Sequence, residues 1–289
     1  MMKKKLRKKI LVTGANGQLG RCLYDVSLRH VEYEFHFKTS SDLDITDKRK
    51  LDNLFVNEKY DYCINCAAYT AVDKAESDKE NAYLVNAEAV KYIADVCEVN
   101  NTILIHISTD FVFDGEVKTL YEEQEKPNPI NEYGSSKLKG EEYIQEISKN
   151  YFIIRTSWVY SEYGHNFVKT MLRLAKERDQ ISVVSDQMGS PTYAGDLAEV
   201  IIKIVNTESQ DYGLYHYSNE GVASWYDFAK AIFDESNIDI KVKPIKSDAY
   251  PTPAKRPVFS IMDKSKIKLT LNIEIPYWRD SLKKVFTFI

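Results

Sequence analysis

A short apolar run that leads directly into three evenly spaced glycines constrains the fold of this chain more than any other feature. Ile10-Leu11-Val12 precedes Thr13-Gly14-Ala15-Asn16-Gly17-Gln18-Leu19-Gly20, and residues 18–30 then have the apolar spacing of a helix. A glycine-rich turn between strand and helix presents free backbone N–H groups at the positive end of the helix, where Rossmann-type folds bind the phosphates of a dinucleotide. Taken alone, the same spacing describes a simple turn about as well.

The three glycines would have different tasks in such a site. Gly14 would permit the tight turn, Gly17 would let the backbone approach the pyrophosphate, and Gly20 would let helix and strand pack closely. We assign the side chains between them to the same cofactor site, namely Asn16, Gln18 and Leu19.

Short apolar strands and helical stretches alternate through the first half of the chain. We expect strands at 9–13, 34–38, 62–65, 102–108 and 151–156, and helices at 18–30, 47–57, 80–100 and 134–148. This alternation predicts a parallel sheet covered by helices on both faces. Ligands of such sheets bind beyond the carboxyl ends of the strands, so the loops of interest are 13–20, 66–74, 108–115 and 156–166.

The pattern loosens from about residue 158. Further strands are expected at 181–184 and 212–218, and helices at 166–178, 194–206, 224–235 and 279–286. We therefore predict a Rossmann-like, doubly wound α/β fold. Its dinucleotide-binding domain would span 1–157 and be completed by about 194–222, and residues 158–289 would form a smaller, discontinuous substrate-binding lobe.

Tyr133 and Lys137 are four residues apart in an expected helix and so share one of its faces. A phenol titrates near ~10, and a neighbouring cation would lower that pKa toward the range in which the phenol can transfer protons. An isolated pair with this spacing is about ten times more often a helix start with a solvated lysine. The glycine turn upstream reverses that preference here.

Residues after two of the expected strands are further candidates for the catalytic and cofactor sites. Thr109 follows the fourth expected strand, where its hydroxyl could hydrogen-bond a substrate carbonyl oxygen that gains charge, although such residues often only cap a local turn. Ala67, Ala68 and Tyr69 follow the third strand, where small residues suit the close approach of a flat cofactor. A tightly packed junction would use alanine as well.

Composition excludes several other functions. A net charge of −4 gives no electrostatic reason to bind nucleic acid, and no stretch approaches the ~20 apolar residues that span a bilayer. The basic run Lys3 to Lys9 is interpreted as a solvated arm, because the apolar run after it is too short for a signal peptide. We therefore expect a cytoplasmic protein.

The four cysteines do not form a metal or redox motif. Cys63 and Cys66 have CxxC spacing, but no second CxxC or close His pair accompanies them. They also fall in or next to an expected strand, where positions i and i+3 point to opposite faces. Reduced thiols are the better interpretation.

The glycine turn, the hydroxyl after the fourth strand and the YxxxK pair together resemble the extended short-chain dehydrogenase/reductase superfamily. Six longer stretches extend the likeness: Tyr69–Glu76, Ser108–Phe113, Arg155–Tyr160, Asn166–Met171, Asp186–Thr192 and Tyr250–Pro257. They are similar to the dTDP-4-dehydrorhamnose reductase family, and the likeness runs from Ile10 to about Leu282.

The resemblance implies NADPH-dependent reduction of the 4-keto group of dTDP-4-dehydro-6-deoxy-L-mannose to dTDP-L-rhamnose, the last step toward this precursor of cell-surface polysaccharide. The family's catalytic set falls on Thr109, Tyr133 and Lys137. Tyr133 would protonate the sugar oxygen, and Lys137 would hold the nicotinamide ribose and lower the tyrosine pKa. The substrate residues would be Val72, Thr109, Asp110, Trp158, Asn166 and Arg256. Trp158 could equally be a core residue, and Arg256 is a candidate diphosphate clamp.

The end of the second expected strand bears on the choice of cofactor. An acidic residue there would hold the ribose hydroxyls of NAD, but the sequence has Phe37-Lys38-Thr39-Ser40-Ser41. Lys38 and the hydroxyls could accommodate a 2′-phosphate, which favours NADPH, with NADH as a second cofactor. Asp44 and Ile45 would flank the adenine, as an acidic–apolar pair does in the superfamily. Some family members are described with magnesium at a dimer contact made by glutamates, but no such ligand can be assigned in this sequence.

Other interpretations stay open. The chain could be another nucleotide-sugar 4-ketoreductase or an epimerase of the same superfamily, and net NADPH consumption separates these, because an epimerase regenerates its cofactor. It could also be a non-catalytic NAD(P)-binding regulatory subunit, but such a protein would be expected to lose Tyr133 or Lys137. We expect a monomer or a homodimer.

Overall fold

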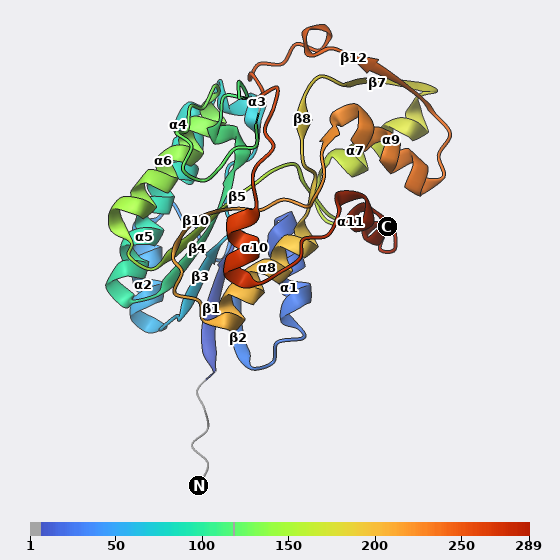
Figure 1. The fold of residues 1–289 in the computed structure, drawn as a ribbon. Coiled ribbons are helices and arrows are strands. Elements are labelled where there is room, and N and C mark those ends of the chain that lie inside the picture. The colour runs from blue at the N-terminus through green and yellow to red at the C-terminus, as the bar shows by residue number, and fades with distance from the viewer. Residues whose placement is uncertain (1–6, 118) are drawn as a thin grey trace.

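A six-stranded parallel sheet forms the centre of the computed structural model, which describes residues 7–117 and 119–289 (Figure 1). Most of the expected basic arm lies outside the described residues. In chain order the strands are β1 (Lys8–Thr13), β2 (Tyr33–Lys38), β3 (Tyr62–Asn65), β4 (Ile103–Thr109), β5 (Tyr151–Thr156) and β10 (Gly213–His216). Their order across the sheet is β10-β5-β4-β3-β1-β2, so the doubly wound α/β fold is confirmed.

The sheet reverses its winding between β1 and β3, because β2 lies on one side of β1 and all later strands lie on the other. The register brings the strand ends together at this point. Thr13, the last residue of β1, pairs with Lys38 of β2 and with Asn65 of β3, and Asn65 in turn pairs with His106 of β4. Ligands of doubly wound sheets bind at such a switch point.

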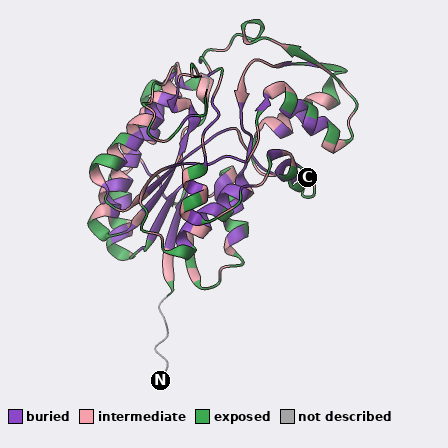
Figure 2. Ribbon diagram, viewed as in Figure 1, coloured by how far each residue is buried: buried purple, intermediate pink, exposed green. Residues whose placement is uncertain are grey.

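Helices cover both faces of the sheet, and the inner strands between them are mostly buried, whereas the edge strand β2 is only partly buried (Figures 1 and 2). One face carries α2 (Lys48–Asn57), α5 (Ala89–Asn100) and α6 (Glu132–Ile147), and the other carries α1 (Gln18–Ser27), α8 (Ala194–Thr207) and α10 (Ser265–Leu271). Helix α10 belongs to the sheet domain. This corrects the prediction that, apart from about 194–222, residues 158–289 form the substrate-binding lobe. Ile267 and Leu271 bury their side chains in the same apolar core as α8.

The remaining elements form a smaller lobe beside the sheet (Figure 1). It contains α7 (Phe167–Glu177), α9 (Trp225–Ser236) and α11 (Trp278–Val285), and a parallel pair of β7 (Gln180–Val184) with β12 (Lys241–Ile245). Two short pairs join β6 (Val159–Tyr160) to β9 (Thr192–Tyr193) and β8 (Met188–Gly189) to β11 (Ala223–Ser224). Phe228 and Trp278 lie in its separate apolar core. Strand β12 has no counterpart among the sequence predictions.

The single helix expected at 80–100 is interrupted. It consists of α4 (Lys79–Tyr83), a π-helical turn (Leu84–Glu88) and α5, and is preceded by the short α3 (Val72–Ala75). The buried Asn86 in the π turn accepts a hydrogen bond from Tyr69 N at 2.8 Å and donates one to Tyr69 O at 3.0 Å. Asn86 in the π turn thus ties the helix to the loop after β3. Such insertions often mark functional sites.

Candidate active site

A cleft of about 530 Å³ opens where the carboxyl ends of the central strands face the smaller lobe. The predicted residues that line it are Asn16, Gly17, Gln18, Leu19, Gly20, Ala68, Val72, Thr109, Asp110, Tyr133, Lys137 and Trp158. The fold therefore brings the glycine turn, the hydroxyl after β4 and the YxxxK pair into one cavity.

The glycine turn has the geometry that a dinucleotide requires. Gly14 has φ +66°, and a Cβ there would lie 2.6 Å from Ala67 N, whereas a Cβ on Gly20 would lie 2.5 Å from Gly14 O. Gly17 is exposed, and the only near neighbour of a Cβ added there would be Gly14 O, at 3.2 Å. No side chain caps the start of α1 at Gly17, so its first N–H groups are available to a phosphate. The residues present fit the cofactor.

Helix α6 places Tyr133 in the cleft. Asn131 caps the helix by accepting a hydrogen bond from Gly134 N at 2.7 Å. Gly134 must lack a side chain, because a Cβ there would lie 2.1 Å from Phe111 O. The rings of Phe111 and Tyr133 meet edge to face with their centroids 5.6 Å apart. The glycine directly after Tyr133 in the sequence is therefore a signal of this close packing.

The electrostatics of the Tyr–Lys pair differ from the sequence prediction. Burial raises the pKa of Tyr133 to about 12, although a hydrogen bond with Thr109 opposes the rise. Burial also lowers the pKa of Lys137 to about 8. The two residues share a helix face, but the amine of Lys137 reaches β4 and donates to Ile107 O at 2.7 Å. The structure therefore does not show the expected lowering of the tyrosine pKa by Lys137.

A buried chain of polar groups leads to the lysine. Thr13 Oγ1 donates to Asn65 Oδ1 at 2.6 Å, Asn65 Nδ2 lies 3.0 Å from His106 Nδ1, and His106 Nε2 lies 3.2 Å from Lys137 Nζ. His106 is fully buried, and this burial lowers its pKa well below the usual range. The neutral imidazole connects β1, β3 and β4 to the YxxxK helix. The sequence analysis did not single out His106.

A buried ion pair fixes α6 against the sheet. Arg155 of β5 donates from Nη2 to Glu141 Oε2 at 2.6 Å, and the two side chains are only 2% and 1% exposed. Ser108 also hydrogen-bonds Glu141. Removing one member of such a pair leaves a buried charge without compensation. The contact therefore disfavours any shift of α6 relative to β5.

Asp110 adds a buried carboxyl group beside the hydroxyl residue. Its Oδ1 accepts a hydrogen bond from Thr109 Oγ1 at 3.1 Å, whereas its Oδ2 is buried and has no partner within the described part of the chain. Burial raises the pKa of Asp110 to about 6. The open oxygen is an acceptor, or a donor when protonated, for a polar group of a ligand.

Trp158 lines the cleft and also packs, partly buried, against the core of the smaller lobe; its backbone conformation, with φ +47°, is rare for a large residue. Its indole stacks on Trp225 of α9 with centroids 3.6 Å apart and 7° between the planes. Gly189 makes room for the ring, because a Cβ at that position would lie 2.6 Å from it. The strained conformation is thus held by contacts from the smaller lobe.

Several predicted residues lie outside the cleft lining: Gly14, Lys38, Asp44, Ile45, Ala67, Tyr69, Asn166 and Arg256. Asn166 caps α7 through Lys169 N and donates to Gln18 Oε1 at 2.8 Å, so its polar atoms are already used by the protein. Ile45 is buried in the core under α2 and α5. Asp44 accepts from Thr46 N and Oγ1.

Arg256 and Tyr69 are likewise held by other residues. Arg256 forms a bidentate pair with Asp73 of α3, at 3.0 Å and 2.8 Å, and also donates to Thr252 Oγ1 at 2.6 Å. The Tyr69 hydroxyl donates to Asp78 at 3.0 Å. The predicted diphosphate clamp thus joins the 250–257 segment to α3.

Ten further residues line the cleft that the sequence analysis did not assign individually, although most of them lie in the predicted loops 66–74, 108–115 and 156–166. They are Cys66, Thr70, Ile107, Ser108, Phe111, Thr156, Val159, Gly164, His165 and Leu197. All four cysteines, Cys22, Cys63, Cys66 and Cys97, are free thiols. Within 7–117 and 119–289, no group of three or more His, Cys, Asp or Glu side chains could hold a metal ion, so nothing supports the magnesium that the resemblance suggested.

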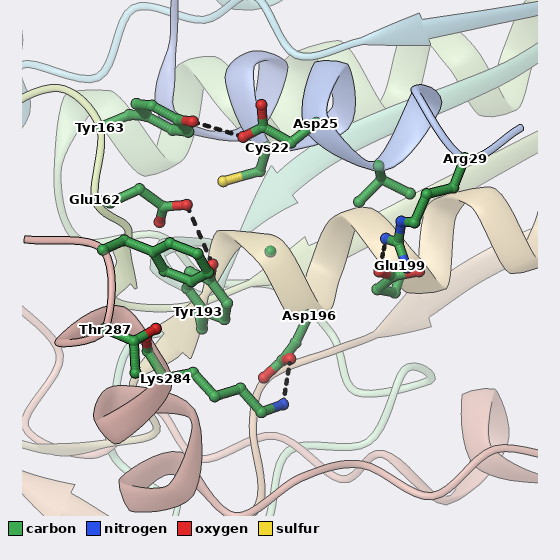
Figure 3. Close-up of a pocket in the computed structure, with 13 residues that line it drawn as sticks. Cys22, Asp25, Arg29, Glu162, Tyr163, Tyr193, Asp196, Glu199, Lys284 and Thr287 are labelled. Carbon is green, nitrogen blue, oxygen red and sulfur yellow. Dashed lines mark hydrogen bonds and ion pairs between the residues drawn. The ribbon is translucent and has the colours of Figure 1, made fainter.

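A second cavity, of about 740 Å³, lies between α1, α8 and α11 (Figure 3). Its charged side chains contact one another or a neighbouring tyrosine. Asp196 pairs with Lys284 at 3.2 Å, Glu199 pairs with Arg29, and Asp25 accepts from Tyr163 at 2.6 Å. Although larger than the cleft, this cavity lacks its glycine turn and its Tyr–Lys pair.

No described helix is long and apolar enough to cross a membrane.

Comparison with known proteins agrees with this geometry. The family described as RmlD substrate binding domain matches residues 8–288. The dTDP-4-dehydrorhamnose reductase of Aggregatibacter actinomycetemcomitans is 44% identical over 288 residues, which cover 96% of this chain and 98% of that protein. Spore coat polysaccharide biosynthesis protein SpsK of Bacillus subtilis (strain 168) is 40% identical over 276 residues and 96% of each chain.

Solved structures show the same relationship. The dTDP-4-dehydrorhamnose reductase from Bacillus anthracis str. Ames, in complex with NADP, superposes with a TM-score of 0.94 at 41% identity, over 98% of this chain and 100% of that one. UDP-glucose 4-epimerase from Thermus thermophilus, in complex with NAD, superposes with a TM-score of 0.83 over 96% of this chain and 98% of that one. At 18% identity the epimerase shares the fold alone.

The parallel sheet, the glycine turn and the Tyr–Lys pair define a Rossmann-type, NAD(P)-dependent oxidoreductase of the extended short-chain dehydrogenase/reductase superfamily. Within that superfamily, the chain belongs to the dTDP-4-dehydrorhamnose reductase family, because the match spans nearly its whole length. The resemblance seen in the sequence is confirmed.

Proposed function

We propose that this chain reduces the 4-keto group of dTDP-4-dehydro-6-deoxy-L-mannose to give dTDP-L-rhamnose, with NADPH as the preferred cofactor. The observation that carries the proposal is the convergence of Thr109, Tyr133 and the glycine turn on one cleft. The family relationship supports the substrate, and the NADP complex of the Bacillus anthracis relative supports the cofactor. Both reactants are charged nucleotides that do not cross bilayers, so we place the reaction in the cytoplasm. A monomer or homodimer stays a prediction.

The residues of the cleft would have separate roles in binding the cofactor and in transferring the proton. The turn at Gly14–Gly20 would hold the cofactor diphosphate, and bound NADPH would supply the hydride. Thr109 would hydrogen-bond the sugar carbonyl oxygen, and Tyr133 would donate a proton to that oxygen as charge develops on it. Because the pKa of Tyr133 is about 12, the phenol carries its proton throughout the physiological range. Val72, Asp110 and Trp158, which line the same cleft, would contact the sugar.

A coupled assay tests the reaction directly. The keto sugar is generated in situ, NADPH oxidation is followed by its absorbance, and the product is identified by mass spectrometry and NMR. Stoichiometric NADPH consumption with formation of dTDP-L-rhamnose is expected. Product formation without net NADPH oxidation would instead indicate an epimerase, and cofactor binding with no turnover would indicate a regulatory subunit.

Tyr133→Phe tests the proton donor. The change keeps the ring against Phe111 and removes only the hydroxyl, so fold and NADPH binding should survive. General acid catalysis by a positioned side chain contributes ~10²–10⁴ in rate, so kcat should fall by about that factor. Near-normal turnover of the variant would place the proton donor elsewhere.

A further inference from the structure

A smaller cavity, of about 390 Å³, adjoins the glycine turn on the side of β2. Ala15 and Asn16 of the turn, Thr39 after β2, and Arg21 of α1 contribute to its walls. In a doubly wound sheet, the end of the second strand is where the adenosine ribose of a dinucleotide lies. Groups in this cavity therefore face the part of the cofactor in which NADP differs from NAD.

Arg21 is the cation in this cavity that is not paired with an acid. Its guanidinium carbon lies 4.1 Å from the centroid of the Tyr163 ring, and within the described ranges no carboxylate pairs with it. Asp25, one turn further along α1, also lines the cavity, but its Oδ2 accepts the Tyr163 hydroxyl hydrogen bond at 2.6 Å. A guanidinium over an aromatic face keeps its N–H donors available at its edge, and their fork matches phosphate oxygens.

The first acidic residue after β2 is bound to its own loop and is not in this cavity. Asp42 is the first acid after β2, and its Oδ2 accepts from Thr39 N at 2.9 Å and from Thr39 Oγ1 at 2.6 Å. Asp42 does not line the cavity, and neither does Lys38, which the sequence analysis chose for the 2′-phosphate. The cation at this end of the cofactor site therefore comes from α1 and not from the end of β2.

We propose that Arg21, with Thr39 beside it, binds the 2′-phosphate of NADPH and makes this chain discriminate NADPH from NADH. The inference rests on the proposed function in so far as that function requires a nicotinamide dinucleotide. It replaces Lys38 as the determinant of cofactor choice.

The test is calorimetric titration of the wild type, Arg21→Ala, Arg21→Lys and Lys38→Ala with NADPH, NADH, adenosine 2′,5′-bisphosphate and 5′-AMP. Arg21→Ala should weaken NADPH and the bisphosphate about tenfold to a hundredfold and leave NADH and 5′-AMP nearly unchanged, as expected for a lost charge-assisted hydrogen bond. Arg21→Lys should recover part of the loss. Lys38→Ala, the matched control, should change the NADPH-to-NADH ratio little. Arg21 is exposed, so the fold should tolerate these changes.

Three outcomes would overturn the assignment. Equal weakening of both dinucleotides in Arg21→Ala would make Arg21 a general contact, no weakening would remove it from the site, and loss of discrimination in Lys38→Ala would restore the original choice. In each case the wild type still binds and oxidises NADPH, so the proposed function stands. If the wild type binds neither dinucleotide, both proposals fall.

Discussion

Lys137 shows how one buried residue can set the pH range of the reaction. Its pKa is lowered to about 8 by burial, so the amine is charged below that pH and neutral above it. Tyr133, with a pKa of about 12, does not titrate in this range. If the ammonium is needed, the rate of ketone reduction should fall as the pH rises through about 8. Lys137→Arg should move that limb to higher pH, because a guanidinium keeps its proton, and an unmoved limb in the pH–rate profile would contradict the assignment.

Asp110 allows a stability test with a defined sign. Its folded-state pKa is raised to about 6 from 3.8, so its burial costs stability above pH 6 and almost none below about pH 4. Asp110→Asn should therefore raise the unfolding free energy at about pH 7 by about 1–3 kcal/mol and have little effect near pH 4. Urea denaturation at both pH values measures this. Asp114→Asn is the control with the opposite sign, because hydrogen bonds lower the pKa of Asp114. An equal effect at both pH values would show that ionisation of Asp110 is not the cause.

At the scale of elements, the ion pair between Arg256 and Asp73 joins the 250–257 segment to α3 beside the cleft. If Arg256 exchanges this partner for the substrate diphosphate, Arg256→Ala should raise KM for the nucleotide-sugar about tenfold to a hundredfold, with NADPH affinity unchanged. Asp73→Asn should raise KM much less, because the cation stays free to bind. Steady-state kinetics on both variants measure the difference. Equal increases would mean that the pair acts only as a structural tie, and a loss of NADPH affinity would move Arg256 to the cofactor side.

Across the whole molecule, stacking of Trp158 on Trp225 connects the cleft to the smaller lobe. An aromatic pair contributes about 0.5–1.5 kcal/mol beyond the area it buries. Trp225→Leu should therefore raise KM for the nucleotide-sugar up to about tenfold and leave NADPH affinity unchanged, because the glycine turn is untouched. Lys230→Ala, on the exposed side of the same helix, is the control. An unchanged KM would show that Trp158 keeps its position without this contact.

The sequence by itself determined the central sheet, the glycine turn and the YxxxK helix. These depend on interactions between residues close in the chain: strand and helix periodicity, the backbone freedom of Gly14, and the four-residue spacing of Tyr133 and Lys137. The strands expected at 9–13, 34–38 and 62–65 therefore match β1 to β3 to within a residue.

Only the tertiary structure decided how the polar side chains of the site are used. Arg256 is held by an acid 183 positions away, Asn166 by a glutamine 148 positions away, and Lys137 by the backbone of β4. Each of these side chains is long enough to reach several possible partners. Which partner it binds depends on which segments the fold packs next to it. Burial then sets the charge of the group, which no local pattern encodes, because desolvation depends on every element around it.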